Sequence, residues 1–214
     1  MCNGECGANL SRTTLSGGGL VNATTGTNIT LTGGTSQDVR GIIFDPINGK
    51  WCYGTAGDGS ISGIFGTVAF SGTSAVLKEL VSGVPAHGLT FDPFTGDIII
   101  NSGTEIEQFN PTTGLFVGPT LTVAGQQLDQ CVADGKGLLF CASNNTGDLV
   151  GVDYDASGLI GSGTVGVTFL ASNLDDVAPL SGIGGTPTPE PASLALLATS
   201  LLGFGLLGRR RNRV

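Results

Sequence analysis

The side chains able to do chemistry are few in this sequence, and the cysteines come first among them. They occupy positions 2, 6, 52, 131 and 141, and no two of them form a CxxC pair. Structural zinc sites usually bring cysteines in pairs at that short spacing, so the pattern disfavours zinc. Cys131 and Cys141 are predicted to lie on neighbouring strands of one hairpin, where an oxidising compartment would permit a disulfide. Cys2 and Cys6 form a second candidate pair, which would leave one odd thiol.

The titratable residues make no catalytic constellation. His87 is the single histidine, and one histidine supplies neither a metal centre nor an obvious triad. The GxSxG, HExxH and phosphate-binding glycine motifs are absent as well. We therefore expect no catalytic residue and no cofactor.

Three aspartates, Asp45, Asp92 and Asp134, recur at one turn position. In the first two turns, Asp binds its own backbone, the following Pro sets φ, and a Gly accepts a positive φ. Two explanations stay open: turn chemistry alone, or a ring of these carboxylates that binds a cation such as calcium. Asp175 and Asp176 are expected to cap a loop before a final strand.

Composition and charge narrow the classes of fold and partner. Glycine accounts for 37 of 214 residues, and the hydrophobic share is 40%. The glycines keep no three-residue period, which excludes collagen, and the apolar content disfavours wholesale disorder. Four of the nine basic residues lie in the last six positions, so residues 1–190 hold five basic and 17 acidic groups. Such a negative body repels phosphate, and we expect no nucleic-acid partner.

The body of the chain repeats itself. Residues 40–49, RGIIFDPING, return 47 positions later as HGLTFDPFTG, and a weaker copy centred on Asp134 follows 42 positions after Asp92. In the middle copy, short β-rich runs at residues 88–91, 97–101, 105–109 and 116–123 predict four strands. Four strands at this period are typical of β-propeller blades. The prediction is an all-β, propeller-like array of four-stranded blades within residues 39–181, with blades at residues 39–86, 87–128 and 129–176.

These repeats resemble the NHL and gluconolactonase-like β-propellers, although no signature singles out one family. Residues 1–38 are interpreted as an N-terminal segment followed by the outer strands of an incomplete blade. Two arrangements remain open. The outer strands could pair with residues 177–180 and close a four-bladed ring, or a six- or seven-bladed propeller could be present here only in part.

The C-terminal segment changes character abruptly. Residues 182–191 form a Gly/Pro-rich linker, and residues 192–208 read ASLALLATSLLGFGLLG without a charge. As a helix, these 17 residues would span roughly 25 Å, just short of a hydrocarbon core of about 30 Å. The following Arg209, Arg210 and Arg211 would stay cytoplasmic by the positive-inside rule. We therefore predict one transmembrane helix and an Arg-rich tail over residues 192–214.

A Pro-Glu-Pro element, an apolar helix and a terminal Arg cluster, in this order, resemble the PEP-CTERM sorting domain of Gram-negative bacteria. The matching residues are Pro189, Glu190 and Pro191, then the apolar run from Ala192, then Arg209 to Arg211. The resemblance covers about residues 187–214 and implies processing by an exosortase near Glu190. It also implies export, an inner-membrane intermediate with a cytoplasmic C-terminus, and final attachment to the cell surface or an exopolysaccharide matrix.

Three functions are compatible with these features. The first is an exported surface or matrix protein whose propeller-like body binds a partner such as exopolysaccharide or surface glycans, or has a structural role. The second is a propeller enzyme of the lactonase or lyase kind, which would need clustered acids and a metal. The third is a membrane protein whose tail is a simple anchor. Residues 1–20 lack the basic start and apolar core of a secretory signal, so we expect either an incomplete N-terminus or a start assigned too late.

Overall fold

The computed structural model describes residues 10–12, 27–33, 39–56, 63–172 and 174–178. These residues form strands and turns apart from one short 3-10 helix, η2, at Ile160–Ser162. The all-β prediction is therefore confirmed for this part of the chain. The strands are β1 (Leu10–Arg12), β2 (Thr27–Thr32), β3 (Val39–Asp45), β4 (Lys50–Thr55), β5 (Ile64–Ser71), β6 (Ser74–Ser82), β7 (Gly88–Phe91), β8 (Ile98–Ser102), β9 (Glu105–Phe109), β10 (Leu121–Thr122), β11 (Leu128–Ala133), β12 (Leu138–Ser143), β13 (Asp148–Asp153) and β14 (Thr164–Phe169).

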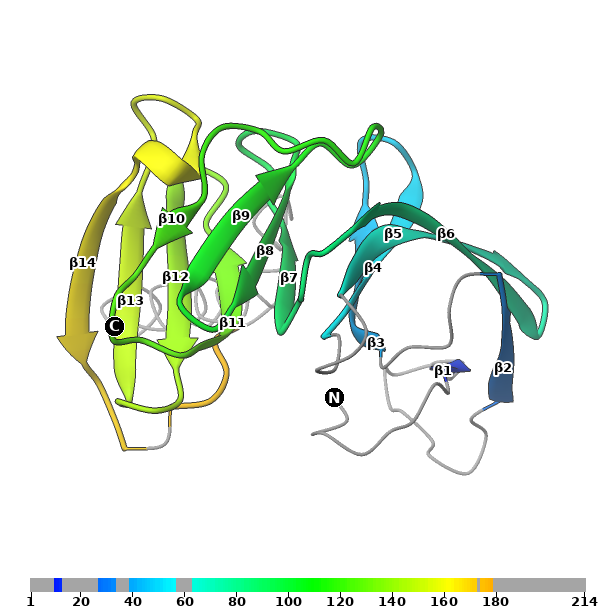
Figure 1. Ribbon diagram of the computed structural model, residues 1–214, viewed down its shortest axis with the longest axis horizontal. Coiled ribbons are helices and arrows are strands. Elements are labelled where there is room, and N and C mark those ends of the chain that lie inside the picture. Colours follow the sequence, from blue (N-terminus) through cyan, green and yellow to red (C-terminus); the bar gives the residue numbers. More distant parts are fainter. Residues whose placement is uncertain (1–9, 13–26, 34–38, 57–62, 173, 179–214) are drawn as a thin grey trace, which may run out of the picture. The chain divides into compact units, whose positions relative to one another are not determined.

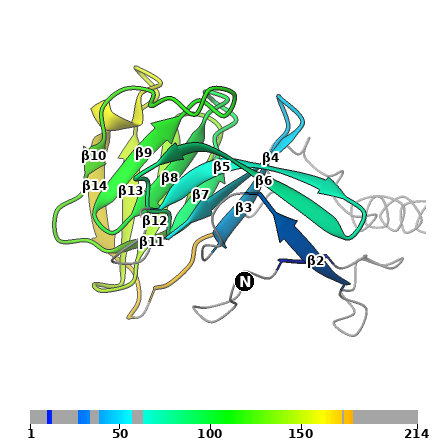
Figure 2. The same cartoon turned by 45° about the vertical axis from the view of Figure 1, so that its right-hand side comes forward.

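The described strands belong to three sheets, each built on an antiparallel run of four consecutive strands (Figure 1). The first sheet has the order β1-β2-β6-β5-β4-β3, the second β10-β9-β8-β7, and the third β11-β12-β13-β14. The inner strands β3, β7 and β11 are neighbours, since β7 contacts both of the others (Figure 2). The fold is propeller-like in this sense: four-stranded units follow one another, and their first strands lie side by side.

The sequence repeat is a structural repeat. Phe44 of β3 pairs with Trp51 of β4, and Phe91 of β7 pairs with Ile98 of β8 in the equivalent register. The tight turn after β7 is closed by a hydrogen bond from the Gly96 N–H to the Asp92 carbonyl (2.8 Å). Gly96 has a φ of 80°, in the left-handed region that glycine enters without a Cβ penalty. The expected equivalence of Phe44 and Phe91 is therefore confirmed.

The middle block departs from the prediction in its fourth strand. Residues 116–123 were expected to be extended throughout, but β10 contains only Leu121–Thr122, preceded by a single bridge between Phe109 and Phe116. Gly118 has a φ of 78° and is followed by Pro119, which has no N–H to donate. A left-handed residue and a missing donor interrupt a strand at this point.

The described strands of the N-terminal segment, interpreted above as outer strands of an incomplete blade, are β1 and β2. β2 pairs in parallel with β6, with Thr30 opposite Ser74, and β1 then pairs with β2. Both strands therefore extend the first sheet at its outer edge. Residues 174–178, the described part of the segment that a closed four-bladed ring would pair with these strands, belong to no strand. An outer strand with an open edge accepts whichever strand can hydrogen-bond to it, and sequence period does not determine that choice.

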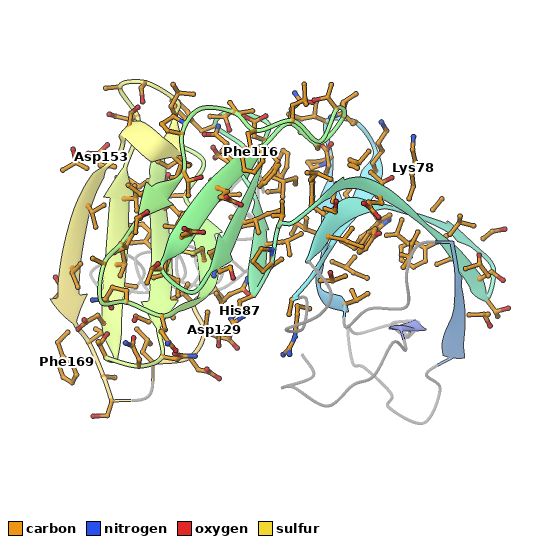
Figure 3. The ribbon with its side chains drawn as sticks, viewed as in Figure 1. Lys78, His87, Phe116, Asp129, Asp153 and Phe169 are labelled. Carbon is orange, nitrogen blue, oxygen red and sulfur yellow. A yellow bond between two sulfur atoms is a disulfide. The ribbon has the colours of Figure 1, made fainter. Side chains whose placement is uncertain are left out.

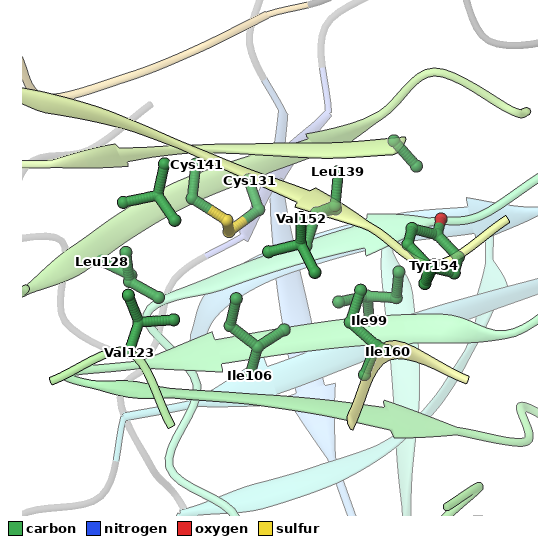
Figure 4. Close-up of a cluster of buried hydrophobic side chains, with 12 residues drawn as sticks. Ile99, Ile106, Val123, Leu128, Cys131, Leu139, Cys141, Val152, Tyr154 and Ile160 are labelled. Atoms are coloured by element: carbon green, nitrogen blue, oxygen red, sulfur yellow. A yellow bond between two sulfur atoms is a disulfide. The ribbon is translucent and has the colours of Figure 1, made fainter. Parts of the chain in front are cut away.

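Apolar side chains fill the space between successive sheets. The core between the first and second sheets includes Phe65, Phe91 and Phe109, all nearly inaccessible to solvent. The core between the second and third sheets is built from twelve buried residues, among them Ile99, Ile106 and Val152 (Figure 4). Each sheet except the terminal ones thus buries both faces, as expected for blades packed in series.

The chain divides into two compact units, residues 1–179 and 180–214. The second unit lies wholly outside the described residues. The predicted linker, the helix at residues 192–208, the Pro-Glu-Pro element and the Arg cluster all fall there. Within the ranges given above, no helix has the length and apolar character needed to cross a bilayer.

Candidate functional site

Titratable side chains recur at the beginning of successive inner strands. Arg40 lies near the start of β3, His87 directly precedes β7, and Asp129 is the second residue of β11. These positions are 47 and 42 residues apart and so are equivalent in the repeat. Figure 3 shows His87 and Asp129 at the same end of their strands. Asp175, which follows β14, comes next to Asp129. We call Arg40, His87, Asn101, Asp129 and Asp175 the inner-strand cluster.

Asn101 of β8 joins the second and third sheets at this cluster. Its Nδ2 donates to the Leu128 carbonyl (3.1 Å) and to the Asp129 carbonyl (2.8 Å). The residue is 1% exposed, and its Oδ1 accepts no hydrogen bond from the described residues. The backbone of Gly88 approaches both groups closely, since a Cβ at Gly88 would lie 2.5 Å from Asn101 Oδ1 and 2.6 Å from the Asp129 carbonyl oxygen. Gly88 therefore permits the contact that sets the start of β11 beside β7.

The charges of the cluster interact. The pKa of Asp129 is raised to about 6, chiefly by burial and also by a hydrogen bond with Asp175 and the negative charges of Asp175 and Asp176, while Arg40 opposes the shift. Burial lowers the pKa of His87, and the positive charge of Arg40 adds to that effect. The cluster can therefore accept hydrogen bonds from hydroxyl or cationic groups and can exchange a proton in mildly acidic solution.

Replacing Asp129 by Asn is expected to flatten the dependence of stability on pH. The folded-state pKa of about 6 exceeds the unfolded value of about 3.9, so the folded protein binds more protons between about pH 4 and 6. The contribution of Asp129 to stability is therefore complete below about pH 4 and is lost as pH rises through about 6. Urea unfolding at several pH values measures this. Asp155→Asn, at an exposed aspartate, is the control, and a parallel pH profile for parent and Asp129→Asn would contradict the assignment.

The three recurrent aspartates are occupied by their own turns. Asp45 Oδ1 accepts the Ile47 and Asn48 N–H groups at 2.9 and 3.1 Å. Asp92 Oδ1 accepts the Phe94 N–H at 3.0 Å. Asp134 Oδ1 accepts the Lys136 and Leu138 N–H groups at 2.7 and 3.0 Å. Turn chemistry accounts for all three, and the described part of the chain contains no group of three or more His, Cys, Asp or Glu side chains able to hold a metal ion.

The cysteines fall into two environments. Cys131 of β11 lies opposite Cys141 of β12, and their sulfurs form a disulfide inside the core between the second and third sheets (Figure 4). Cys52 is a buried free thiol whose pKa burial raises to about 12, with a smaller contribution from Asp45. A thiol that is neutral and buried is chemically inert. Cys2 and Cys6 lie outside the described residues.

Comparison with known protein families gives a match near the C-terminus of the chain. The family model of the PEP-CTERM protein-sorting motif matches residues 187–211. The chain carries a PEP-CTERM motif. The resemblance seen in Pro189, Glu190, Pro191 and the terminal arginines is thereby confirmed, and the PEP-CTERM motif indicates export and sorting.

Solved structures resemble the part of the chain that precedes the PEP-CTERM motif. A chain in a nidogen/laminin complex is 20% identical, with a TM-score of 0.50, over 66% of this chain and 52% of that one. Regucalcin, a calcium-binding protein from Agrobacterium tumefaciens, is 17% identical, with a TM-score of 0.46, over 64% and 48%. The chain thus spans about half the length of these two structures. The propeller-like fold is confirmed, and the likeness extends to fold alone. Comparison with curated proteins gives no match.

Sequence reasoning missed several residues that the fold brings together. Asn101 carries no motif, so nothing in the sequence singles it out. Asp129 had a usable signal, because it stands 42 residues after His87 in the repeat. Asp175 was expected to cap a loop, and the structure places it beside Asp129, which the sequence did not indicate.

Proposed function

We propose that this protein is exported, is held transiently in the inner membrane by residues 192–208, and is delivered to the cell surface or extracellular matrix by an exosortase. The observation that carries this proposal is the PEP-CTERM motif at residues 187–211. In this topology the three arginines from Arg209 to Arg211 remain cytoplasmic and the body lies outside. The body is then the cargo that sorting delivers.

The proposed role of the body is binding, and the inner-strand cluster is its best-suited part. Asp129 and Asp175 accept hydrogen bonds from hydroxyl groups, and Arg40 and His87 can donate them. Polyhydroxylated glycans offer both kinds of partner. The excess of acidic over basic residues in positions 1–190 repels polyanions. We therefore favour a neutral exopolysaccharide or surface glycan over an acidic one.

Glu190→Ala tests the sorting proposal. The full chain is produced behind a secretory signal in a host with an exosortase and in the same host without it. The parent is expected to lose its C-terminal segment only when the enzyme is present. Glu190 lies between two prolines, which favour extended backbone at the intervening residue and so lower the ordering cost of recognition. The variant should remain membrane-bound and uncut.

The measurement is the mass of the mature protein together with its distribution between membrane and surface fractions. Thr188→Ala, two residues upstream, is the matched control and should be processed normally. Replacement of Arg209, Arg210 and Arg211 by Ser removes groups that each cost roughly 2.5–3.5 kcal/mol to insert, and should release chains in the wrong orientation. Cleavage of Glu190→Ala at the parent's rate would overturn the proposed role of the Pro-Glu-Pro element.

A further inference from the structure

The three sheets end in outer edges of very different character. In the first sheet, Ser74–Val76 of β6 are already paired with β2, and β6 carries Lys78 and Glu79 beyond that pairing. In the second sheet, β10 is only two residues long. Both are devices by which proteins prevent edge strands from pairing with other chains.

The third sheet has neither device. β14 contains six residues, Thr164–Phe169, and all six are exposed. Among the described residues it forms the free edge of its sheet, and it is paired over its whole length with β13 on the other side (Figure 1). Residues 156–174 contain no Asp, Glu, Lys, Arg or His. An extended, regular, uncharged edge strand of this kind is a template for addition of a further strand.

The exposed side chains of β14 are apolar on one face. Val165, Val167 and Phe169 are 37%, 47% and 63% exposed, and Leu170 directly after them is 58% exposed. Figure 3 shows Phe169 at the end of this strand. Val165 and Val167 stand opposite Val152 and Val150 of β13, which are fully buried. The row of apolar side chains on this face of the third sheet therefore continues from β13 to the edge strand β14, where Val165 and Val167 are partly exposed.

The sequence of this edge is the same in both directions. Residues 164–168 read TVGVT, with Gly166 at the centre. In an antiparallel pair of two such strands centred on Gly166, Val165 of one copy faces Val167 of the other, and Thr164 faces Thr168. Like side chains then meet, and Thr–Thr and β-branched pairs are favourable across antiparallel strands. An isologous two-fold interface requires this kind of self-complementarity.

The backbone polarity of β14 fits the same register. Leu170 N–H donates to the Gly147 carbonyl (3.1 Å), and Tyr154 N–H donates away from β14, to the Gly137 carbonyl (2.8 Å). Because hydrogen-bonding direction alternates along an antiparallel strand, Gly166 points its N–H and C=O toward β13, whereas Val165 and Val167 point theirs outward. Pairing centred on Gly166 matches Val165 with Val167, so each pair exchanges two hydrogen bonds.

We propose that β14 is a homodimerisation edge, at which a second copy of this chain adds its own β14 antiparallel and in register about Gly166. The result is one continuous sheet across the two-fold axis, made from the third sheets of both copies. β14 contains no charged side chain, so no like charges of the two copies would meet directly at this contact. The proposal is independent of the glycan-binding role.

The dimer is tested with the purified full chain in detergent by sedimentation over a range of concentrations. Val167→Lys places two lysines at diagonal positions across the two-fold axis, about 7–8 Å apart along the sheet, and should raise the dimer dissociation constant roughly tenfold or more. Val76→Lys is the matched control: Val76 is 51% exposed but lies on β6, whose edge is already paired. It should leave the dimer intact.

A crosslink tests the register directly. Gly166 has open space where a Cβ would lie, so Gly166→Cys is tolerated, and two such residues would face each other with Cα atoms about 4.5 Å apart. In a background with Cys2 and Cys6 replaced by Ser, oxidation should give a covalent dimer, whereas Ser74→Cys on β6 should not. A monomeric parent, a dimer that survives Val167→Lys, or absence of the Gly166→Cys crosslink would each overturn the proposal. Association through the apolar tail would be insensitive to Val167→Lys.

Discussion

Replacement of Gln108 by Ala should lower the free energy of unfolding by about 3 kcal/mol, because it removes a hydrogen bond from two buried polar groups and one half-buried polar group. Gln108 of β9 is 1% exposed. Its Nε2 donates to Asp97 Oδ2 (2.8 Å) and to the Gly158 carbonyl (3.0 Å), and its Oε1 accepts the Ile160 N–H (3.0 Å). One amide thus joins the second sheet to the segment around η2 in the third block.

The loss of stability in Gln108→Ala should also depend on pH, because the pKa of Asp97 depends on its hydrogen bond with Gln108. Burial raises the pKa of Asp97, and the hydrogen bond from Gln108 acts in the opposite direction by stabilising the carboxylate. Without that bond, the folded-state pKa rises further above the unfolded value. The charged form is then more costly to bury, so the destabilisation should be greater at neutral pH than in acid, where Asp97 is protonated.

Urea unfolding followed by circular dichroism at neutral and acidic pH measures both effects. Gln127→Ala, at a residue of the same type with an exposed side chain, is the matched control and should change stability by less than about 0.5 kcal/mol. If Gln108→Ala behaves like Gln127→Ala, the amide is not the link between the two sheets.

The second large effect concerns the disulfide. Removing it by the double replacement of Cys131 and Cys141 with Ala should cost about 2–3 kcal/mol from the unfolded-state entropy of a loop this short. Both residues also belong to the buried core between the second and third sheets, so the lost sulfur atoms leave a cavity that adds to the cost. The double variant should therefore be less stable than the parent even under reducing conditions.

A reductant separates the two contributions. Reduction should lower the free energy of unfolding of the parent only by the contribution of the crosslink. The free energy of unfolding of the double variant should not change on reduction. Cys52→Ala removes a buried thiol outside the disulfide, so it should lose some packing energy and still respond to reductant. Equal stability of the parent with and without reductant would contradict a stabilising disulfide.

Local and periodic features of this protein could be predicted from its sequence. The turn after Phe44 and the turn after Phe91 are set by consecutive residues, since Asp, Pro and Gly each impose a specific backbone preference. The same applies to the hairpin that brings Cys131 opposite Cys141, and to the PEP-CTERM motif, whose three parts follow one another along the chain. In each case the interacting residues are close in sequence, so their types and spacing carry the information.

Tertiary structure alone decided what happens between sheets and at their edges. Gln108 reaches Ile160 across 52 positions, and Asn101 reaches Asp129 across 28. Neither contact leaves a local pattern in the sequence, because each depends on how two sheets pack against each other. The parallel addition of β2 to β6 and the free edge at β14 likewise depend on which strand reaches an open edge. The sequence of residues 164–168 is palindromic wherever it lies, but only the fold leaves that strand exposed at an edge, where its symmetry can bring two copies together.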